Sequence, residues 1–136
     1  MKRSEAREQA FNIVYELNFH DDKSVKELID SATEARELKI DPFARALAEK
    51  TGEMRILLDD IINKYSAKWK VERLSTVAAA LLRMSLCEIL YSEDVPASVS
   101  INEAVELAKK YGSDEDAPFI NGVLGAFVRD QEGKTE

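Results

Sequence analysis

The sequence has 136 residues, enough for one domain with a sizeable core, and its 26 acidic and 19 basic side chains leave a formal net charge of −7. Such an acidic chain does not suit non-specific coating of nucleic acid, because affinity for phosphates comes from lysine and arginine, although a small local contact stays open. A single cysteine excludes an internal disulfide, and no apolar run suits a membrane span or a signal peptide. We therefore expect a folded cytoplasmic protein that crosses no membrane.

The N-terminal half predicts three helices. The first begins near Ser4, a residue type that caps helices, and carries apolar residues on one face. The second follows a capping-box spacing at Ser24, and the third begins at Asp41, which precedes a proline that suits the first helical position. Helical apolar spacing then continues to Tyr65, over about six turns at 3.6 residues each. Gly52 inside this third helix indicates a close helix crossing or a slight bend.

The next segment predicts a joint followed by a buried helix. Residues 66–69 form the joint, where the only tryptophan, Trp69, is expected to fill the seam between two helical groups. A helix from Thr76 to about Tyr91, capped by Ser75, is apolar around almost its whole circumference. That pattern is typical of a helix buried at the centre of a fold.

The stretch of residues 95–124 has the clearest helix signals. Ser100 and Glu103 have capping-box spacing, and Gly112 suits a left-handed helix end. A last helix is expected over about residues 117–130. No segment alternates with a period of two for the length of a strand, so the predicted fold class is all-α, with six or seven helices packed as bundles.

The residues offer no constellation for catalysis. His20 lies alone beside Asp21 and Asp22 in a loop, and the sequence has no second histidine with which to build a proton relay. Cys87 lies on the predicted buried helix, where a thiol is inert. Neither metal-ligand spacing of Cys and His nor a phosphate-binding glycine loop is present. We predict a non-enzyme without catalytic residues, metal or cofactor.

Phe119 and Asn121 are the sharpest candidates for a binding site, since they flank the apolar stripe of the last helix. An aromatic ring and an amide at a surface suit single-stranded RNA, which offers bases for stacking and base edges for hydrogen bonds. Alternatively, the ring covers the edge of the core and the amide caps a backbone group. Lys109 and Tyr111 would lie close if the intervening loop folds the last two helices together, adding a phosphate contact and a second stacking surface.

Two further sets of charged residues allow two interpretations each. Lys2, Arg3 and Arg7 are either phosphate contacts or an ordinary polar start of a helix, and the residues alone favour the ordinary start. Arg83 and Glu88 lie on the most apolar helix, where a buried charge needs a partner. They therefore either pair within the chain or mark a side of the helix that docks another protein.

Several of these segments together resemble the NusB transcription antitermination family. The similarity lies in Leu82-Arg83 and Glu88, in Ile101-Asn102-Glu103-Ala104, in Phe119-Ile120-Asn121-Gly122-Val123-Leu124, and in Ala6-Arg7-Glu8 with Tyr15. It covers nearly the whole chain. The resemblance implies one domain over residues 1–136, built from two packed three-helix groups at about residues 1–65 and 71–130.

The resemblance also implies a function. It suggests a non-enzymatic adaptor that binds boxA-like single-stranded RNA with a NusE-type small ribosomal protein. On RNA polymerase the complex would promote antitermination, notably of ribosomal RNA operons. The resemblance favours RNA contact for Phe119, Asn121 and the N-terminal cations. It favours protein docking for the helix that carries Arg83 and Glu88. Residues 88–116 contain eight acidic and two basic side chains, a net −6 that suits a basic partner.

Two rival functions are compatible with the same residues. The sparse N-terminal arginines are compatible with a protein-interaction module that makes no RNA contact of its own. Helical domains of this type also accompany RNA methyltransferases, so an accessory domain related to those enzymes is the second rival. RNA titration with and without the basic partner separates the first rival from the adaptor, and measured methyl transfer would favour the second.

Overall fold

The computed structural model describes residues 1–19, 23–36 and 39–134. It describes the side chains of these residues except those of 32–36 and 134. Within this part of the chain there are seven α-helices, one 3-10 turn and no strand, which confirms the all-α prediction. The elements are α1 (Arg3–Leu17), α2 (Val25–Arg36), α3 (Pro42–Glu53), α4 (Arg55–Tyr65), η1 (Val71–Arg73), α5 (Thr76–Tyr91), α6 (Ala97–Tyr111) and α7 (Asp116–Lys134). His20, Asp21 and Asp22 lie outside the described residues. None of the described helices is both long and apolar enough to cross a membrane.

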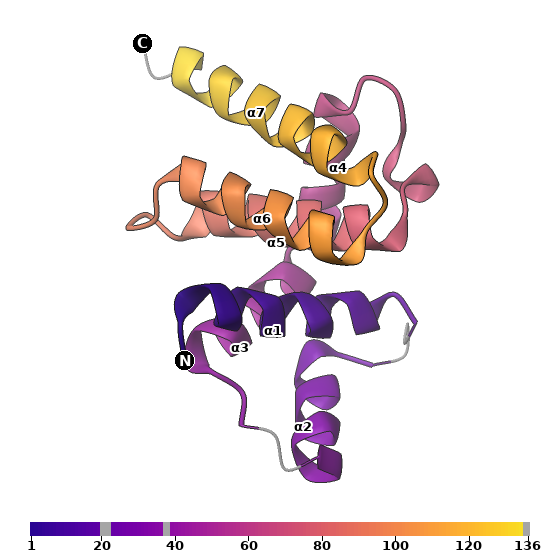
Figure 1. Cartoon of the computed structure of the whole chain (residues 1–136), viewed down its shortest axis with the longest axis vertical. Helices are drawn as coiled ribbons and strands as arrows, with labels where there is room; N and C mark the ends of the chain where they lie inside the picture. Colours follow the sequence, from indigo (N-terminus) through magenta and orange to yellow (C-terminus); the bar gives the residue numbers. More distant parts are fainter. Residues whose placement is uncertain (20–22, 37–38, 135–136) are drawn as a thin grey trace.

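The helices form two groups that meet at α5. Figure 1 shows α1, α2 and α3 on one side and α4, α6 and α7 on the other. α5 packs against α1, α3, α4, α6 and α7. The resemblance implied a division between the groups near residues 65–71. In the structure α4 packs mainly against α5 and α7 and less against α3, so its contacts lie mostly with the second group.

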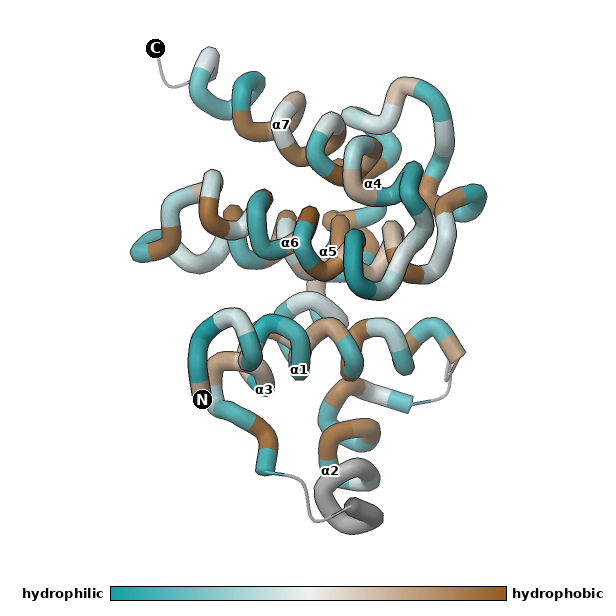
Figure 2. The backbone as a smooth tube through the Cα atoms, in the orientation of Figure 1, coloured by the Kyte–Doolittle hydropathy of each residue, from teal (hydrophilic) through white to brown (hydrophobic). Residues whose placement is uncertain are grey.

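α5 is the buried helix that the sequence predicted. Every residue from Ala78 to Glu88 is buried, including the charged Arg83 and Glu88. Along α6 and α7, hydrophobic and hydrophilic positions instead alternate around the helix (Figure 2). The contrast follows from position, since a helix surrounded by five others has no face left for water.

The predicted single helix from Asp41 to Tyr65 is two helices. The break comes at Met54, directly after a turn that contains Gly52 and Thr51. The Thr51 hydroxyl donates to the carbonyl of Leu47 at 2.7 Å, an interaction that competes with regular helix bonding. Gly52 marks a close approach, as expected: a Cβ there would lie 2.5 Å from Val25 Cγ2 of α2.

Helix starts agree with the sequence only in part. The side chains of Asp41 and Ser75 accept hydrogen bonds from the first turns of α3 and α5, as predicted. The Ser4 cap is wrong, because α1 begins at Arg3 with Lys2 at the cap position, and Ser4 lies inside its first turn. The Ser100 capping box is also wrong, because Pro96 precedes the first turn of α6 and leaves Ser100 inside the helix.

Two expectations about single residues are also corrected. Gly112 is extended, with φ −105°, rather than left-handed. A Cβ there would lie 2.5 Å from an Asp116 carboxylate oxygen and 3.0 Å from the backbone oxygen of Ala108, so a larger residue would require the Asp116 side chain to move. Trp69 is 46% exposed and does not fill the seam between helical groups. The ring of Tyr65 instead packs edge-on against Phe127, with centroids 5.5 Å apart, and joins α4 to α7.

Candidate RNA-binding and partner-binding surfaces

The α6–α7 groove brings together two of the predicted RNA-binding residues. Because the loop after α6 turns α7 back alongside it, Lys109 and Asn121 line the same hollow of about 400 Å³. Both side chains are exposed. The remaining lining residues are Val105, Ser113, Asp114, Ala117 and Pro118. The groove therefore offers an ammonium group and an amide to one ligand, above a partly apolar floor.

The two predicted aromatic contacts lie beside this groove rather than in it. Phe119 is half-buried and packs against the core, so it covers the core edge as the alternative interpretation had it. Tyr111 is 39% exposed, and its ring centroid lies 5.1 Å from that of Phe11 on α1. Tyr111 thus keeps part of its ring free for stacking.

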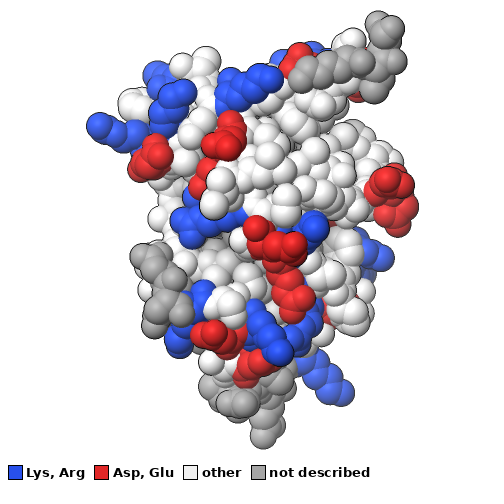
Figure 3. Space-filling model, turned by 180° about the vertical axis from the view of Figure 1, so that it is seen from behind, with Lys and Arg blue, Asp and Glu red and all other residues white. Residues whose placement is uncertain are grey.

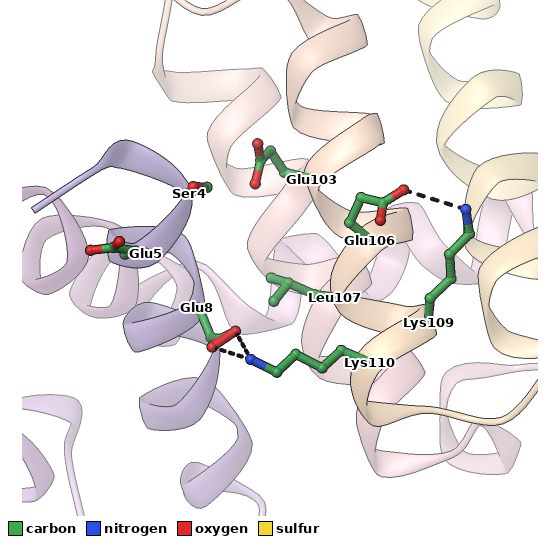
Figure 4. Close-up of a pocket in the computed structure, with 8 residues that line it drawn as sticks. All are labelled: Ser4, Glu5, Glu8, Glu103, Glu106, Leu107, Lys109 and Lys110. Carbon is green, nitrogen blue, oxygen red and sulfur yellow. Dashed lines mark hydrogen bonds and ion pairs between the residues drawn. The ribbon is translucent and has the colours of Figure 1, made fainter.

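A second groove, the α1–α6 groove, lies between those two helices (Figure 4). Its volume is about 560 Å³, and it is lined by Ser4, Glu5, Glu8, Glu103, Glu106, Leu107, Lys109 and Lys110. Lys110 Nζ lies 2.8 Å from both carboxylate oxygens of Glu8. Lys109 Nζ lies 3.3 Å from Glu106 Oε1. Both lysines at the end of α6 are therefore engaged by carboxylates of this chain.

The N-terminal cations divide into two exposed residues and one buried residue. Lys2 and Arg3 are exposed, and the Arg3 guanidinium lies 4.0 Å from the centre of the Phe43 ring. Arg7 is only 4% exposed, and its Nε donates to both oxygens of Glu88 at 2.9 and 3.0 Å. In this arrangement the Arg7 guanidinium is engaged by Glu88 inside the chain, whereas the resemblance implied a contact with RNA.

The sequence contains the signal that Arg7 is buried. Phe11 and Val14 follow it by four and seven residues, which places all three on one helical face. That face is the buried face of α1. Glu103, assigned to capping by its position in the sequence, also turns inward and lies 3.9 Å from Arg7 Nη1. Part of the acidic excess over residues 88–116 is thus internal.

Arg83 is buried in a second cross-helix network. Its guanidinium lies 2.6 and 3.1 Å from the two carboxylate oxygens of Asp59 on α4, and 3.2 Å from Oδ1 of Asn18 at the end of α1. The expectation that α5 presents Arg83 and Glu88 at a protein-docking surface is therefore not met. Both charges pair within the chain, because each needs a partner once it is removed from water.

The described surface has no large basic patch on the face seen in Figure 3, where acidic and basic side chains are interspersed.

Among the described residues no three His, Cys, Asp or Glu side chains gather around a metal-sized site. Cys87 is buried, and desolvation raises the pKa of its thiol, which keeps it protonated near neutral pH. The fold defines the class of small all-helical domains.

The chain belongs to the NusB family, whose model matches residues 4–129. It is 40% identical over 132 residues to a transcription antitermination protein NusB from Bacillus subtilis (strain 168), covering 97% of this chain and 98% of the relative. Family members of this kind are transcription antitermination factors and not enzymes.

Solved structures give the same result. The structure of T. maritima NusB is similar with a TM-score of 0.82 and 29% identity, covering 96% of this chain and 92% of that one. A crystal structure of the antitermination factors NusB and NusE in complex with dsRNA is similar with a TM-score of 0.81 and 25% identity, covering 96% and 99%. These matches extend the likeness from sequence to the whole arrangement of helices.

Proposed function

We propose that this chain is a non-enzymatic RNA-binding adaptor of transcription antitermination, notably over ribosomal RNA operons. It binds boxA-like RNA together with a NusE-type small ribosomal protein, and the complex acts on RNA polymerase in the cytoplasm. The observation that carries this proposal is the full-length likeness to a NusB that was solved with NusE and RNA. The family membership of residues 4–129 supports it.

The surfaces support binding through two proteins rather than by this chain alone. Arg7, Lys109 and Lys110 are each engaged by a carboxylate of the chain, and the net charge is −7. A basic partner would supply the missing attraction to phosphate, and joining two modest surfaces raises the effective concentration of each for the RNA. Lys2, Arg3 and the α6–α7 groove are the RNA-facing parts that we propose for this chain.

The form of the RNA is a separate part of the proposal. The related complex contains double-stranded RNA. Asn121 in the groove and the half-exposed ring of Tyr111 suit unpaired bases better, because paired bases do not expose their faces or Watson–Crick edges. We therefore propose single-stranded RNA as the ligand, with Phe119 supporting the first turn of α7 and contributing its exposed edge.

Arg83 and Glu88 contribute to partner binding indirectly in this proposal. Both are buried and paired. They fix α1 and α4 on α5, and so hold the neighbouring surface residues in the geometry that a docking protein meets. The accessory-domain rival has no support from the Bacillus subtilis relative, an antitermination protein that is matched over 98% of its own length.

The test is a titration of labelled boxA-type RNA with this protein, with the NusE-type protein, and with both, using a double-stranded form of the same RNA as a control. We expect the pair to bind the single strand more tightly than either protein alone. If the pair binds no better than the NusE-type protein by itself, the chain is an interaction module without its own RNA contact. Preference for the duplex would contradict the single-strand part of the proposal.

A further inference from the structure

The ion pair between Glu8 and Lys110 joins α1 to α6, and both residues line the α1–α6 groove (Figure 4). Lys110 Nζ lies 2.8 Å from both oxygens of the Glu8 carboxylate, so the contact is two-pronged. The Lys110 side chain is 59% exposed and that of Glu8 is 29% exposed. A solvent-accessible ammonium group is therefore held by a partly buried carboxylate of another helix.

The neighbouring pair between Lys109 and Glu106 differs in kind. Its partners are three residues apart on one helix, 3.3 Å from each other, and both side chains are at least 62% exposed. Pairs of that type are weak and exchange readily with water. Lys110 is more firmly engaged, and hydrogen bonding to Glu8 raises its pKa. Lys110 stays charged at neutral pH.

We propose that Glu8 acts as an internal competitor of RNA phosphate for the ammonium group of Lys110, and so limits the RNA affinity of this chain. The inference rests on the proposed function. A phosphate offers the same oxygen acceptors as a carboxylate, and Glu8 already holds the ammonium group through both of its oxygens and offsets its charge. Lys110 lies next to Lys109, which lines both this groove and the α6–α7 groove. RNA in the α6–α7 groove therefore comes close to Lys110 and gains less from it than from an unpaired lysine.

The test compares Glu8→Gln with the matched control Glu5→Gln, each in complex with a NusE-type protein and titrated with labelled boxA-type single-stranded RNA. Glu5 lines the same groove and makes no ion pair among the described residues. Both variants change the net charge equally. We expect Glu8→Gln to tighten binding by about two- to fivefold relative to Glu5→Gln, the size typical of an exposed ion pair.

Two further readouts separate competition from a general charge effect. The salt dependence of binding should steepen for Glu8→Gln, by about 0.7 in the logarithmic slope for one added contact to a single strand. The gain should vanish when Lys110→Met is also present, as a double-mutant cycle reports. Thermal melting of each variant shows that the fold is kept.

The outcomes distinguish this inference from the proposed function. If the unaltered complex binds RNA but Glu8→Gln and Glu5→Gln behave alike, Glu8 is not a competitor and the proposed function stands. Competition by Glu8 is likewise excluded if the gain from Glu8→Gln persists in the Lys110→Met background. If the unaltered complex binds no better than the NusE-type protein alone, and Glu8→Gln adds nothing, both proposals fail.

Discussion

Arg7 and Glu88 show how single side chains hold the two helical groups together. The pair joins α1 to α5, with side chains 4% and 3% exposed. Removing one partner leaves the other charge buried and unpaired, which costs far more than an exposed ion pair contributes. The two residues therefore stabilise the packing of α1 on α5, and any effect on ligand binding is indirect.

The first prediction concerns this pair. Arg7→Met and Glu88→Gln should each lower the free energy of unfolding by about 3–5 kcal/mol, measured by denaturant titration. The double variant Arg7→Met/Glu88→Gln should lose less than the sum of the single changes, because neither buried charge is left without its partner. Arg45→Ala, which removes solvent-accessible pairs with Glu49 and Asp30, is the control and should cost about 1 kcal/mol or less. Equal losses for Arg7→Met and Arg45→Ala would contradict the assignment.

The second prediction separates Asn121 from Phe119. Asn121→Ala should weaken RNA binding by the complex and change the free energy of unfolding by less than about 0.5 kcal/mol, since the side chain is exposed. Phe119→Ala should weaken binding and also lower the melting temperature, because its ring packs on the core. Asn12→Ala, an exposed amide on α1, is the control for RNA affinity. Unchanged affinity for Asn121→Ala would remove the α6–α7 groove from the RNA site.

At the scale of the elements, the approach of α3 to α2 depends on one missing side chain. A Cβ at Gly52 would lie 2.5 Å from Val25 Cγ2, closer than such atoms come in folded proteins. Val25 is buried, so its methyl group has little room to move. The helical preference for alanine over glycine is worth about 1 kcal/mol, and the clash opposes it.

The third prediction follows from this contact. Gly52→Ala should lower the free energy of unfolding by about 1–3 kcal/mol, as insertions into a packed contact do. In a Val25→Ala background the same substitution should be neutral or stabilising, because the space is then open and the helical preference remains. Denaturant titration of the four proteins of the cycle checks this. A stabilising Gly52→Ala in the unaltered chain would show that Val25 moves aside easily.

At the scale of the whole molecule, the distribution of charge decides how RNA binding responds to salt. Lys2 and Arg3 are exposed at the start of α1, and Arg3 stacks on Phe43 while keeping its guanidinium accessible. Arg7 is buried against Glu88, so we expect it to contribute no counterion release from a phosphate. The resemblance implied RNA contact for all three cations, whereas the structure exposes Lys2 and Arg3 and buries Arg7.

The fourth prediction uses that separation. Replacing Lys2 and Arg3 with serine should flatten the salt dependence of RNA binding by the complex. The logarithmic slope should fall by up to about 1.4 for two contacts to a single strand. Replacing Arg7 should change stability instead, as predicted above. Affinity measured over a range of salt concentrations checks this, and an unchanged slope would show that the N-terminus does not touch RNA.

Much of this architecture is readable from local patterns. The helical class, the buried α5 and the caps at Asp41 and Ser75 were predicted, because periodicity and capping depend on residues within a few positions of each other. The break at Met54 was missed, since apolar spacing continues through it. The capping box at Ser100 was misplaced, because Pro96 starts α6 one turn earlier.

The sequence by itself determined the helical fold class, the buried helix α5 and, through its motifs, the resemblance to the family. Only the tertiary structure decided which charges face water and which face each other. Arg7 meets Glu88 across 81 positions, Arg83 meets Asp59, and Lys110 meets Glu8 across 102 positions. Such pairs depend on how helices are placed in space, and periodicity along one helix shows which face is buried but not what that face contacts.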